Sequence, residues 1–219
     1  MSWTLAHSLW MTALSLLSWA AGDARLAATG GALSLAVLIY LRRSEWSPQG
    51  AFGAGNAVTA VRGALIVLFA ALPGAGPAGA ALVMGIFCLD GVDGWLARRG
   101  PGSSVFGAIF DMETDALLVL VAGLKLQASG RLGTWILVPG LLRYVYAVAI
   151  SLLPASYGEA PRSLLARLVF AIVIASFVMS LWPVHPLHPW FAALATILLV
   201  VSFARSAIWS FRPHLQRLA

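Results

Sequence analysis

Long apolar runs, broken at intervals by Gly, Pro or charged residues, dominate the chain. Each run is about as long as the roughly 20 residues that an α-helix needs to cross the hydrocarbon core of a bilayer. The pattern therefore predicts an all-α, polytopic membrane helical bundle with about eight transmembrane helices. The predicted helices cover residues 4–21, 26–41, 56–74, 77–98, 106–128, 134–154, 164–183 and 189–211.

The longest polar stretch, residues 42–55, separates the first two predicted helices from the rest. We interpret it as an interfacial linker that follows an N-terminal transmembrane hairpin. The predicted division is a hairpin with its linker over residues 1–52 and a second domain over residues 53–219. The first apolar run lacks the basic residues that precede the apolar core of a secretory signal, so we expect it to stay in the protein.

Composition supports a membrane protein and argues against a nucleic-acid-binding one. Hydrophobic residues make up 60% of the chain and charged residues 10%, whereas soluble domains carry about 25% charged residues. The formal net charge is +6. The basic residues lie near the ends of predicted helices and form no stripe with aromatic residues between them, so no nucleic-acid partner is expected.

The distribution of basic residues predicts the orientation in the membrane. Cytoplasmic loops carry an excess of Lys and Arg, and an even number of helices places both termini on one side. With both termini in the cytoplasm, most of the arginines fall on or near that side: Arg42, Arg43, Arg98, Arg99, Arg162, Arg167, Arg212 and Arg217. Arg25, Lys125 and Arg131 fall outside. We expect an integral protein of a bacterial cytoplasmic membrane.

Four aspartates stand out inside two of the apolar runs. Asp90 and Asp93 are three residues apart, and Asp111 and Asp115 are four apart, so each pair shares one face of a predicted helix. Only 17 residues separate Asp93 from Asp111, and a hairpin would bring the two faces together. Carboxylates are costly inside a membrane, so this group indicates bound cations and a function at the cytoplasmic end of the helices.

Oxygen ligands alone favour Mg²⁺, Mn²⁺ or Ca²⁺ over zinc at such a site. Gly94, Ala97 and Gly107 keep the inner surface of the predicted hairpin small and leave space for a bulky ligand. Arg98 lies one turn after Gly94 and can pair with phosphate oxygens. The residues therefore indicate a metal-dependent site for a phosphorylated ligand.

Residues 90–115, DGVDGWLARRGPGSSVFGAIFDMETD, resemble the signature of the CDP-alcohol phosphotransferase family, D-x2-D-G-x2-A-R-x8-G-x3-D-x3-D. Every fixed position of that signature is present. Upstream, the segment GNAVTAVR is similar to the P-N-x2-T-x2-R segment of the family, with Gly55 in place of the proline and with Asn56, Thr59 and Arg62 matching. The resemblance covers about residues 53–211, so the N-terminal hairpin falls outside the six-helix core of the family.

The resemblance implies a role for each matching residue. Asp90, Asp93 and Asp111 would hold two divalent cations, Mg²⁺ or Mn²⁺, and Asp115 would ligate the second and act as the general base. The metals and Arg98 would bind the diphosphate of a CDP-linked donor, most plausibly CDP-diacylglycerol, whose acyl chains remain in membrane lipid. The implied nucleotide pocket is formed by Gly55, Asn56, Thr59, Gly94, Ala97, Ser104 and Gly107.

The acceptor is a small alcohol whose identity the sequence leaves open. Family members that act on phosphorylated alcohols place basic residues in the region of Arg143, Arg162 and Arg167, so these three are candidate acceptor-binding residues. They favour glycerol 3-phosphate. Choline, serine and inositol, or their phosphates, are the alternatives. The family resemblance also predicts a homodimer.

Two other functions use intramembrane aspartates. An intramembrane prenyltransferase also holds a diphosphate through aspartates and Mg²⁺, but those enzymes carry their aspartates on helices far apart in the sequence. A cation transporter would need polar residues that continue across the bilayer, yet the outer halves of the two Asp-bearing segments are apolar. Phospholipid synthesis by a CDP-alcohol phosphotransferase is therefore the leading hypothesis.

Overall fold

The computed structural model of the chain describes residues 2–47, 50–99, 104–152, 164–182 and 186–218, with side chains left undescribed for 93–99 and 211–218. This part of the chain is all-helical and contains no β-strand. The elements in chain order are α1 (Trp3–Ala21), α2 (Ala24–Leu41), η1 (Arg43–Glu45), α3 (Ala54–Ala71), α4 (Pro77–Arg99), α5 (Val105–Ala128), η2 (Thr134–Leu137), α6 (Val138–Leu152), α7 (Leu164–Leu181) and α8 (His188–Leu218).

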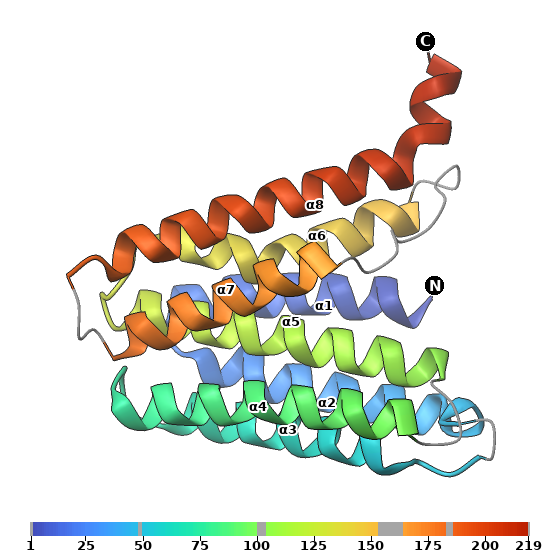
Figure 1. Cartoon of the computed structure of the whole chain (residues 1–219), viewed down its shortest axis with the longest axis horizontal. Coiled ribbons are helices and arrows are strands. Elements are labelled where there is room, and N and C mark those ends of the chain that lie inside the picture. The colour runs from blue at the N-terminus through green and yellow to red at the C-terminus, as the bar shows by residue number, and fades with distance from the viewer. Residues whose placement is uncertain (1, 48–49, 100–103, 153–163, 183–185, 219) are drawn as a thin grey trace.

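Each predicted helix is present, and the helices lie alongside one another in an elongated bundle (Figure 1). The predicted segment 134–154 divides into the short 3₁₀ helix η2 and α6, because Pro139 lacks an amide hydrogen and fits only near the start of an α-helix. The last helix begins close to the predicted residue and continues to Leu218, beyond the predicted end at residue 211.

Five helical segments in the described residues are long and apolar enough to cross a membrane. The segments are Ala24–Leu41, Ala54–Ala71, Thr134–Leu152, Leu164–Leu181 and His188–Ser210. In α4, the apolar helical stretch with described side chains, Pro77–Val92, is shorter. Charged residues interrupt the apolar sequence of α5, and Ser and Thr residues dilute that of α1. The prediction of a polytopic membrane helical bundle is confirmed.

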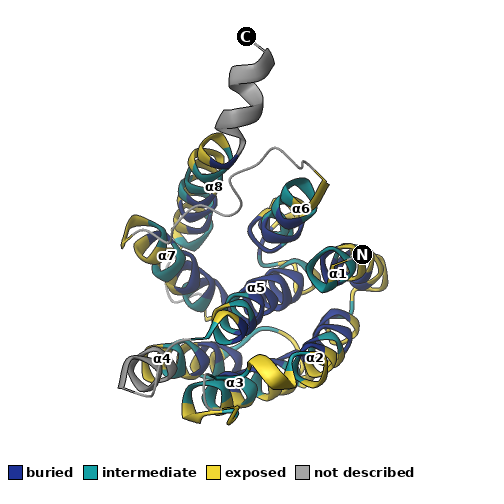
Figure 2. Cartoon of the chain, turned by 90° about the vertical axis from the view of Figure 1, so that its right-hand side faces the viewer, coloured by how far each residue is buried: buried dark blue, intermediate teal, exposed yellow. Residues whose placement is uncertain are grey.

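Helix α5 lies at the centre of the bundle, and the other α-helices surround it (Figure 2). Around this ring, α1 packs on α2, α2 on α3, α3 on α4, α4 on α7, α7 on α8, α8 on α6, and α6 back on α1. Residues 116–126 of α5 are all buried, which suits a run that is apolar on every side apart from Lys125. The N-terminal hairpin of α1 and α2 therefore completes the ring rather than extending from it.

Small residues let the neighbours approach α5 closely. At Gly140 in α6, an added Cβ would lie 2.5 Å from the Cα of Leu120 in α5. Close backbone contact of this kind is a common way for helices to pack in membranes, where lipid competes with apolar side chains.

Lys125, near the end of α5, forms a hydrogen bond with the C-terminal end of α3. Its Nζ donates a hydrogen bond of 2.5 Å to the carbonyl of Leu72, the C-cap residue of α3. The last carbonyls of a helix lack partners within the helix and carry partial negative charge. This contact fixes α5 against α3 at the end of the bundle opposite to the aspartates.

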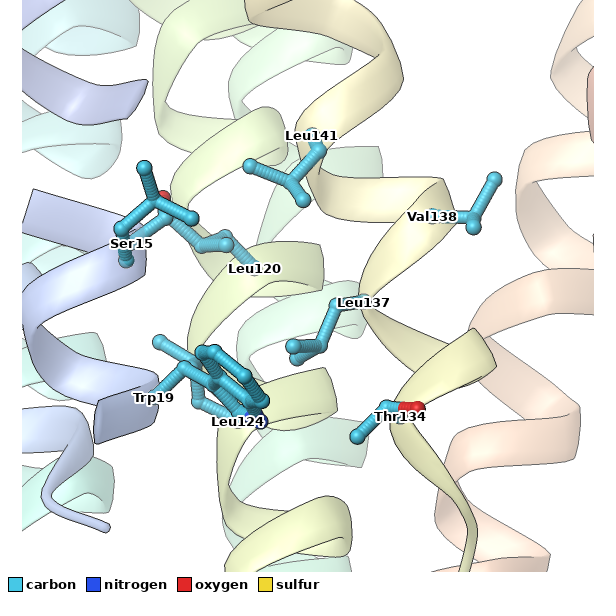
Figure 3. Close-up of a pocket in the computed structure, with 9 residues that line it drawn as sticks. Ser15, Trp19, Leu120, Leu124, Thr134, Leu137, Val138 and Leu141 are labelled. Carbon is cyan, nitrogen blue, oxygen red and sulfur yellow. The ribbon is translucent and has the colours of Figure 1, made fainter. Parts of the chain in front are cut away.

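A cavity of about 330 Å³ lies between α1, α5, η2 and α6 (Figure 3). Its walls are mostly apolar: Ser15, Leu16, Trp19, Leu120, Leu124, Thr134, Leu137, Val138 and Leu141. No carboxylate or cationic side chain lines it, so it has none of the groups that bind a diphosphate. The aspartates Asp90, Asp111 and Asp115 lie outside this cavity.

Candidate active site

The site is built on α4 and α5, at the end of the bundle where both chain termini lie (Figure 1). Ser104 is the N-cap of α5, and its Oγ accepts a hydrogen bond of 2.9 Å from the amide of Gly107. The cap residue lies seven positions before Asp111, so the helix begins six residues before that aspartate. The spacing of four residues then places Asp111 and Asp115 one above the other on the same face of α5.

Three of the predicted metal ligands converge, and we call Asp90, Asp111 and Asp115 the carboxylate cluster. Each offers an oxygen atom, and these atoms lie within 4.8 Å of one another. Their side chains are 30%, 23% and 20% exposed, respectively, so a ligand can reach them. The side chain of the fourth predicted ligand, Asp93, lies outside the described residues.

Arg62 of α3 lies on the buried side of the carboxylate cluster and contacts all three of its members. Its Nη1 is 3.1 Å from Oδ1 of Asp90 and 2.9 Å from Oδ1 of Asp111, and its Nη2 donates to Oδ1 of Asp115. The side chain is only 1% exposed. A guanidinium presents five N–H donors in a fixed plane, so its two terminal nitrogens can contact different carboxylates at the same time.

Sequence reasoning placed Arg62 in a matching motif but gave it no role. The available signal was its position, because it is the only charged residue of α3. A cation in an apolar helix implies a partner of opposite charge. The carboxylates inside the apolar runs of the next two helices were the candidate partners.

The donor set of the carboxylate cluster fits a hard divalent cation. Carboxylate oxygens are the ligands that Mg²⁺, Mn²⁺ and Ca²⁺ prefer, and the described neighbourhood offers no thiolate or imidazole among the clustered ligands. Three carboxylates so close together repel one another unless positive charge is supplied. Arg62 supplies one such charge, and a bound cation would supply more.

The predicted nucleotide-binding residues Asn56, Ser104 and Gly107 lie together next to Trp46. Nδ2 of Asn56 donates hydrogen bonds to the carbonyls of Phe52, at 2.5 Å, and Trp46, at 3.2 Å. The Ser104 hydroxyl donates to the same Trp46 carbonyl at 2.8 Å. The start of α5 is thus joined to the segment that precedes α3.

Gly107 is required by this close approach. A Cβ added there would lie 2.9 Å from Oδ1 of Asn56, so a larger residue would displace the Asn56 side chain and disturb its hydrogen bonds. One turn along α3, Thr59 is buried and donates from Oγ1 to the Gly55 carbonyl at 3.2 Å. The side chains of the remaining predicted pocket residues, Gly94, Ala97 and Arg98, lie outside the described part.

Of the three predicted acceptor-binding arginines, the structure describes the surroundings of two, Arg143 and Arg167. Nη2 of Arg143 donates a hydrogen bond of 2.6 Å to Oε1 of Glu113, and both side chains are buried. Arg167 is exposed in the first turn of α7, and Arg162 lies outside the described residues. The acceptor role of these residues stays a prediction.

Most of the chain matches a known protein family. Residues 52–205 match the CDP-alcohol phosphatidyltransferase family. A stretch of 29 residues is 62% identical to CDP-diacylglycerol--inositol 3-phosphatidyltransferase 1 of Arabidopsis thaliana; it covers 13% of this chain and only 13% of that relative's length. No solved structure matches the chain. Because the family match covers most of the chain, including the whole carboxylate cluster and Arg62, the chain belongs to the CDP-alcohol phosphatidyltransferase family.

Proposed function

We propose that this protein makes a phospholipid by transferring the phosphatidyl group of CDP-diacylglycerol to a small alcohol, with release of CMP. Its family uses a CDP-alcohol and an alcohol acceptor, and the chain is an integral membrane protein. The observation that carries the proposal is the carboxylate cluster with Arg62 at one end of the bundle, inside the family-matched residues. The same family match favours this activity over prenyl transfer or cation transport.

Two divalent cations, Mg²⁺ or Mn²⁺, are the proposed cofactors. Members of the family generally depend on divalent metals. Asp90, Asp111 and Asp115 would hold them together with Asp93, in agreement with the oxygen-only donor set. When bound, such cations neutralise the charge of the diphosphate and of the departing CMP.

Asp115 is the proposed general base. It is the cluster member farthest along α5, and its carboxylate is partly exposed and held by Arg62. The base takes the proton of the acceptor hydroxyl, and the hydroxyl oxygen bonds to the β-phosphorus that carries diacylglycerol. The bond from that phosphorus to the bridging oxygen breaks, and CMP leaves with the electron pair. Arg62 holds the orientation of Asp115 for this proton transfer.

The cytidine half of the donor would lie beside the start of α5. Asn56, Ser104 and Gly107 are gathered there, with Gly55 and Thr59 on the adjoining turns of α3. The predicted contributions of Gly94, Ala97 and Arg98 on α4 would complete the pocket. A soluble acceptor would enter from the water at this end while the acyl chains stay in lipid.

Two acceptors remain in view for the same chemistry. Glycerol 3-phosphate is favoured by the positive charge of Arg162 and Arg167. Two observations support inositol. Arg143, one of the three arginines that favour a phosphorylated acceptor, is already paired with Glu113. The Arabidopsis relative is also named for inositol. Choline and serine have no observation in their favour beyond the family.

The decisive experiment measures CMP release by purified protein with CDP-diacylglycerol, Mg²⁺ or Mn²⁺, and a panel of these alcohols. Asp115→Asn should reduce turnover at least about 100-fold, since general-base catalysis contributes typically 10²–10⁴-fold. Asp23→Asn is the matched control, because Asp23 caps α2 at the other end of the bundle. Undiminished turnover in folded Asp115→Asn would refute the proposed base.

The same assay distinguishes the acceptors. If glycerol 3-phosphate is the acceptor, Arg167→Ala should raise its KM and leave the KM of CDP-diacylglycerol unchanged. Turnover with inositol and none with glycerol 3-phosphate would reverse the present ranking.

A further inference from the structure

A buried polar network lies on the side of α5 that faces away from the carboxylate cluster. It comprises His7 of α1, Ser34 of α2, Glu113 of α5 and Arg143 of α6. Nδ1 of His7 is 2.7 Å from Oγ of Ser34, and Nε2 of His7 is 3.6 Å from Oε2 of Glu113. The other oxygen of Glu113 accepts the 2.6 Å hydrogen bond from Arg143. Four helices are thus joined around one carboxylate.

His7, Glu113 and Arg143 are buried and Ser34 is partly buried, and the histidine ring is packed on both sides. Glu113 is 0% and His7 3% exposed. The indole of Trp3 stacks on the imidazole with ring centroids 4.5 Å apart, and the ring of Tyr144 meets it edge-on at 5.8 Å. With the ring held from two sides, Nε2 stays directed at the carboxylate. The 3.6 Å separation is just beyond hydrogen-bond length, so in this structure the imidazole faces the carboxylate without a direct hydrogen bond between the two atoms.

Glu113 stands midway between two proposed metal ligands. Two residues of α-helix correspond to a rotation of about 200° and a rise of about 3 Å. The carboxylates of Asp111 and Asp115 therefore leave α5 on one face, where Arg62 contacts them, while Glu113 leaves it on the other. Any rotation of α5 that released Glu113 from Arg143 would swing both aspartates away from Asp90. Contacts on the two faces together fix the rotation of the helix.

His7 and Ser34 belong to the N-terminal hairpin, which precedes the family-matched residues. We propose that His7 is a positioning residue: from this added hairpin it holds Glu113 and so sets the arrangement of the metal ligands on α5. The inference rests on the metal site of the proposed function. In this proposal the hairpin helps to position the metal ligands, in addition to anchoring the chain in the membrane.

Loss of a group bonded directly to a metal ligand typically lowers metal affinity by roughly 10–100-fold. His7 acts through Glu113, so the effect of its loss should lie near the lower end of that range. Glutamine at position 7 keeps an N–H donor that can reach Glu113, whereas leucine fills similar space without one. A purely structural role for His7 predicts that the two substitutions act alike. A positioning role predicts that glutamine restores what leucine loses.

The test measures Mn²⁺ binding by electron paramagnetic resonance, with thermal stability recorded on the same samples. His7→Leu should weaken Mn²⁺ binding about tenfold or more, and His7→Gln should stay within about threefold of the unaltered protein. Ser15→Ala is the matched control: Ser15 is also buried on α1, and its hydroxyl bonds only within its own helix, to the Met11 carbonyl at 2.6 Å. It should leave Mn²⁺ affinity unchanged.

Equal Mn²⁺ affinities for His7→Leu and the unaltered protein would overturn the proposal, and so would equal losses in His7→Leu and His7→Gln. If His7→Leu does not fold, Glu113→Gln is measured in the same way, and unaltered affinity there also overturns it. Failure of the proposed function would look different. Protein that binds Mn²⁺ with these differences among variants, yet releases no CMP from any donor, would contradict the activity and leave the role of His7 standing.

Discussion

In the part of the bundle whose side chains are described, each buried charged side chain contacts either an opposite charge or the terminal carbonyls of another helix. Arg62 meets the carboxylate cluster, Arg143 meets Glu113, and Lys125 meets the terminal carbonyls of α3. An unpaired charge in an apolar interior is strongly destabilising, so each of these residues fixes the position of its partner's helix. At the residue scale, the contacts that offset the cost of burying these charges also position the residues of the candidate active site.

Arg62→Ala should destabilise the protein most when divalent metal is removed. The substitution leaves three close carboxylates without their shared cation. Breaking a fully buried ion pair costs about 3–5 kcal/mol, and the cost here should be smaller because the carboxylates are 20–30% exposed. In EDTA, Arg62→Ala should unfold at a clearly lower Tm than the unaltered protein. Addition of Mn²⁺ should raise the Tm of Arg62→Ala by more than it raises the Tm of the unaltered protein.

Arg43→Ala is the control for this comparison, since Arg43 is exposed in η1 and stacks over the ring of Tyr40. Its Tm should change little in either condition. A Tm for Arg62→Ala in EDTA equal to that of the unaltered protein would show that the carboxylates do not depend on the guanidinium.

At the scale of the elements, the sequence predicted the positions of the helices along the chain well, but it did not predict which helices pack against one another. Apolar runs of membrane length and the Gly and Pro breaks between them locate each of the described α-helices, and the spacing of Asp111 and Asp115 places both on one face. The order of helices around α5 depends on contacts between residues far apart in the chain. Arg62 and Asp115 are 53 residues apart, and no local pattern connects them.

The fit between α5 and α6 makes a prediction about helix packing. Gly140→Ala should destabilise the protein by about 1–3 kcal/mol, because the new methyl group would meet backbone, 2.5 Å from the Cα of Leu120, and backbone cannot turn aside. Gly85→Ala in α4 is the control, since no heavy atom lies within 4 Å of an added Cβ there. It should be neutral or slightly stabilising, as alanine favours helix. Chemical denaturation in mild detergent would compare the two; equal stabilities would contradict the close fit.

At the scale of the whole molecule, the N-terminal hairpin was predicted as a separate unit of residues 1–52, and that division remains a prediction. The structure shows α1 packed on α6 and α2 packed on α3 and α5. Sequence reasoning found no role for His7, because a single histidine in an apolar run gives no partner by its spacing. Its partner Glu113 is more than 100 residues away. The predicted homodimer likewise depends on contacts outside one chain.

The arrangement of the helices also bears on the predicted orientation. Arg42, Arg43 and Arg167 lie at the end of the bundle that carries the carboxylate cluster, whereas Lys125 and Arg131 lie at the opposite end. Because Lys and Arg favour the cytoplasmic side, the site should face the cytoplasm. There it would meet water-soluble acceptors made in the cell.

Cysteine labelling in intact cells tests this orientation. The chain has one cysteine, Cys88, so Cys88→Ser gives a background for single cysteines at Ser44, exposed at the site end, and Ser129, exposed at the other end. A membrane-impermeant maleimide should label Ser129→Cys in intact cells and should label Ser44→Cys only after permeabilisation. The reverse pattern would place the carboxylate cluster outside and would contradict the predicted orientation.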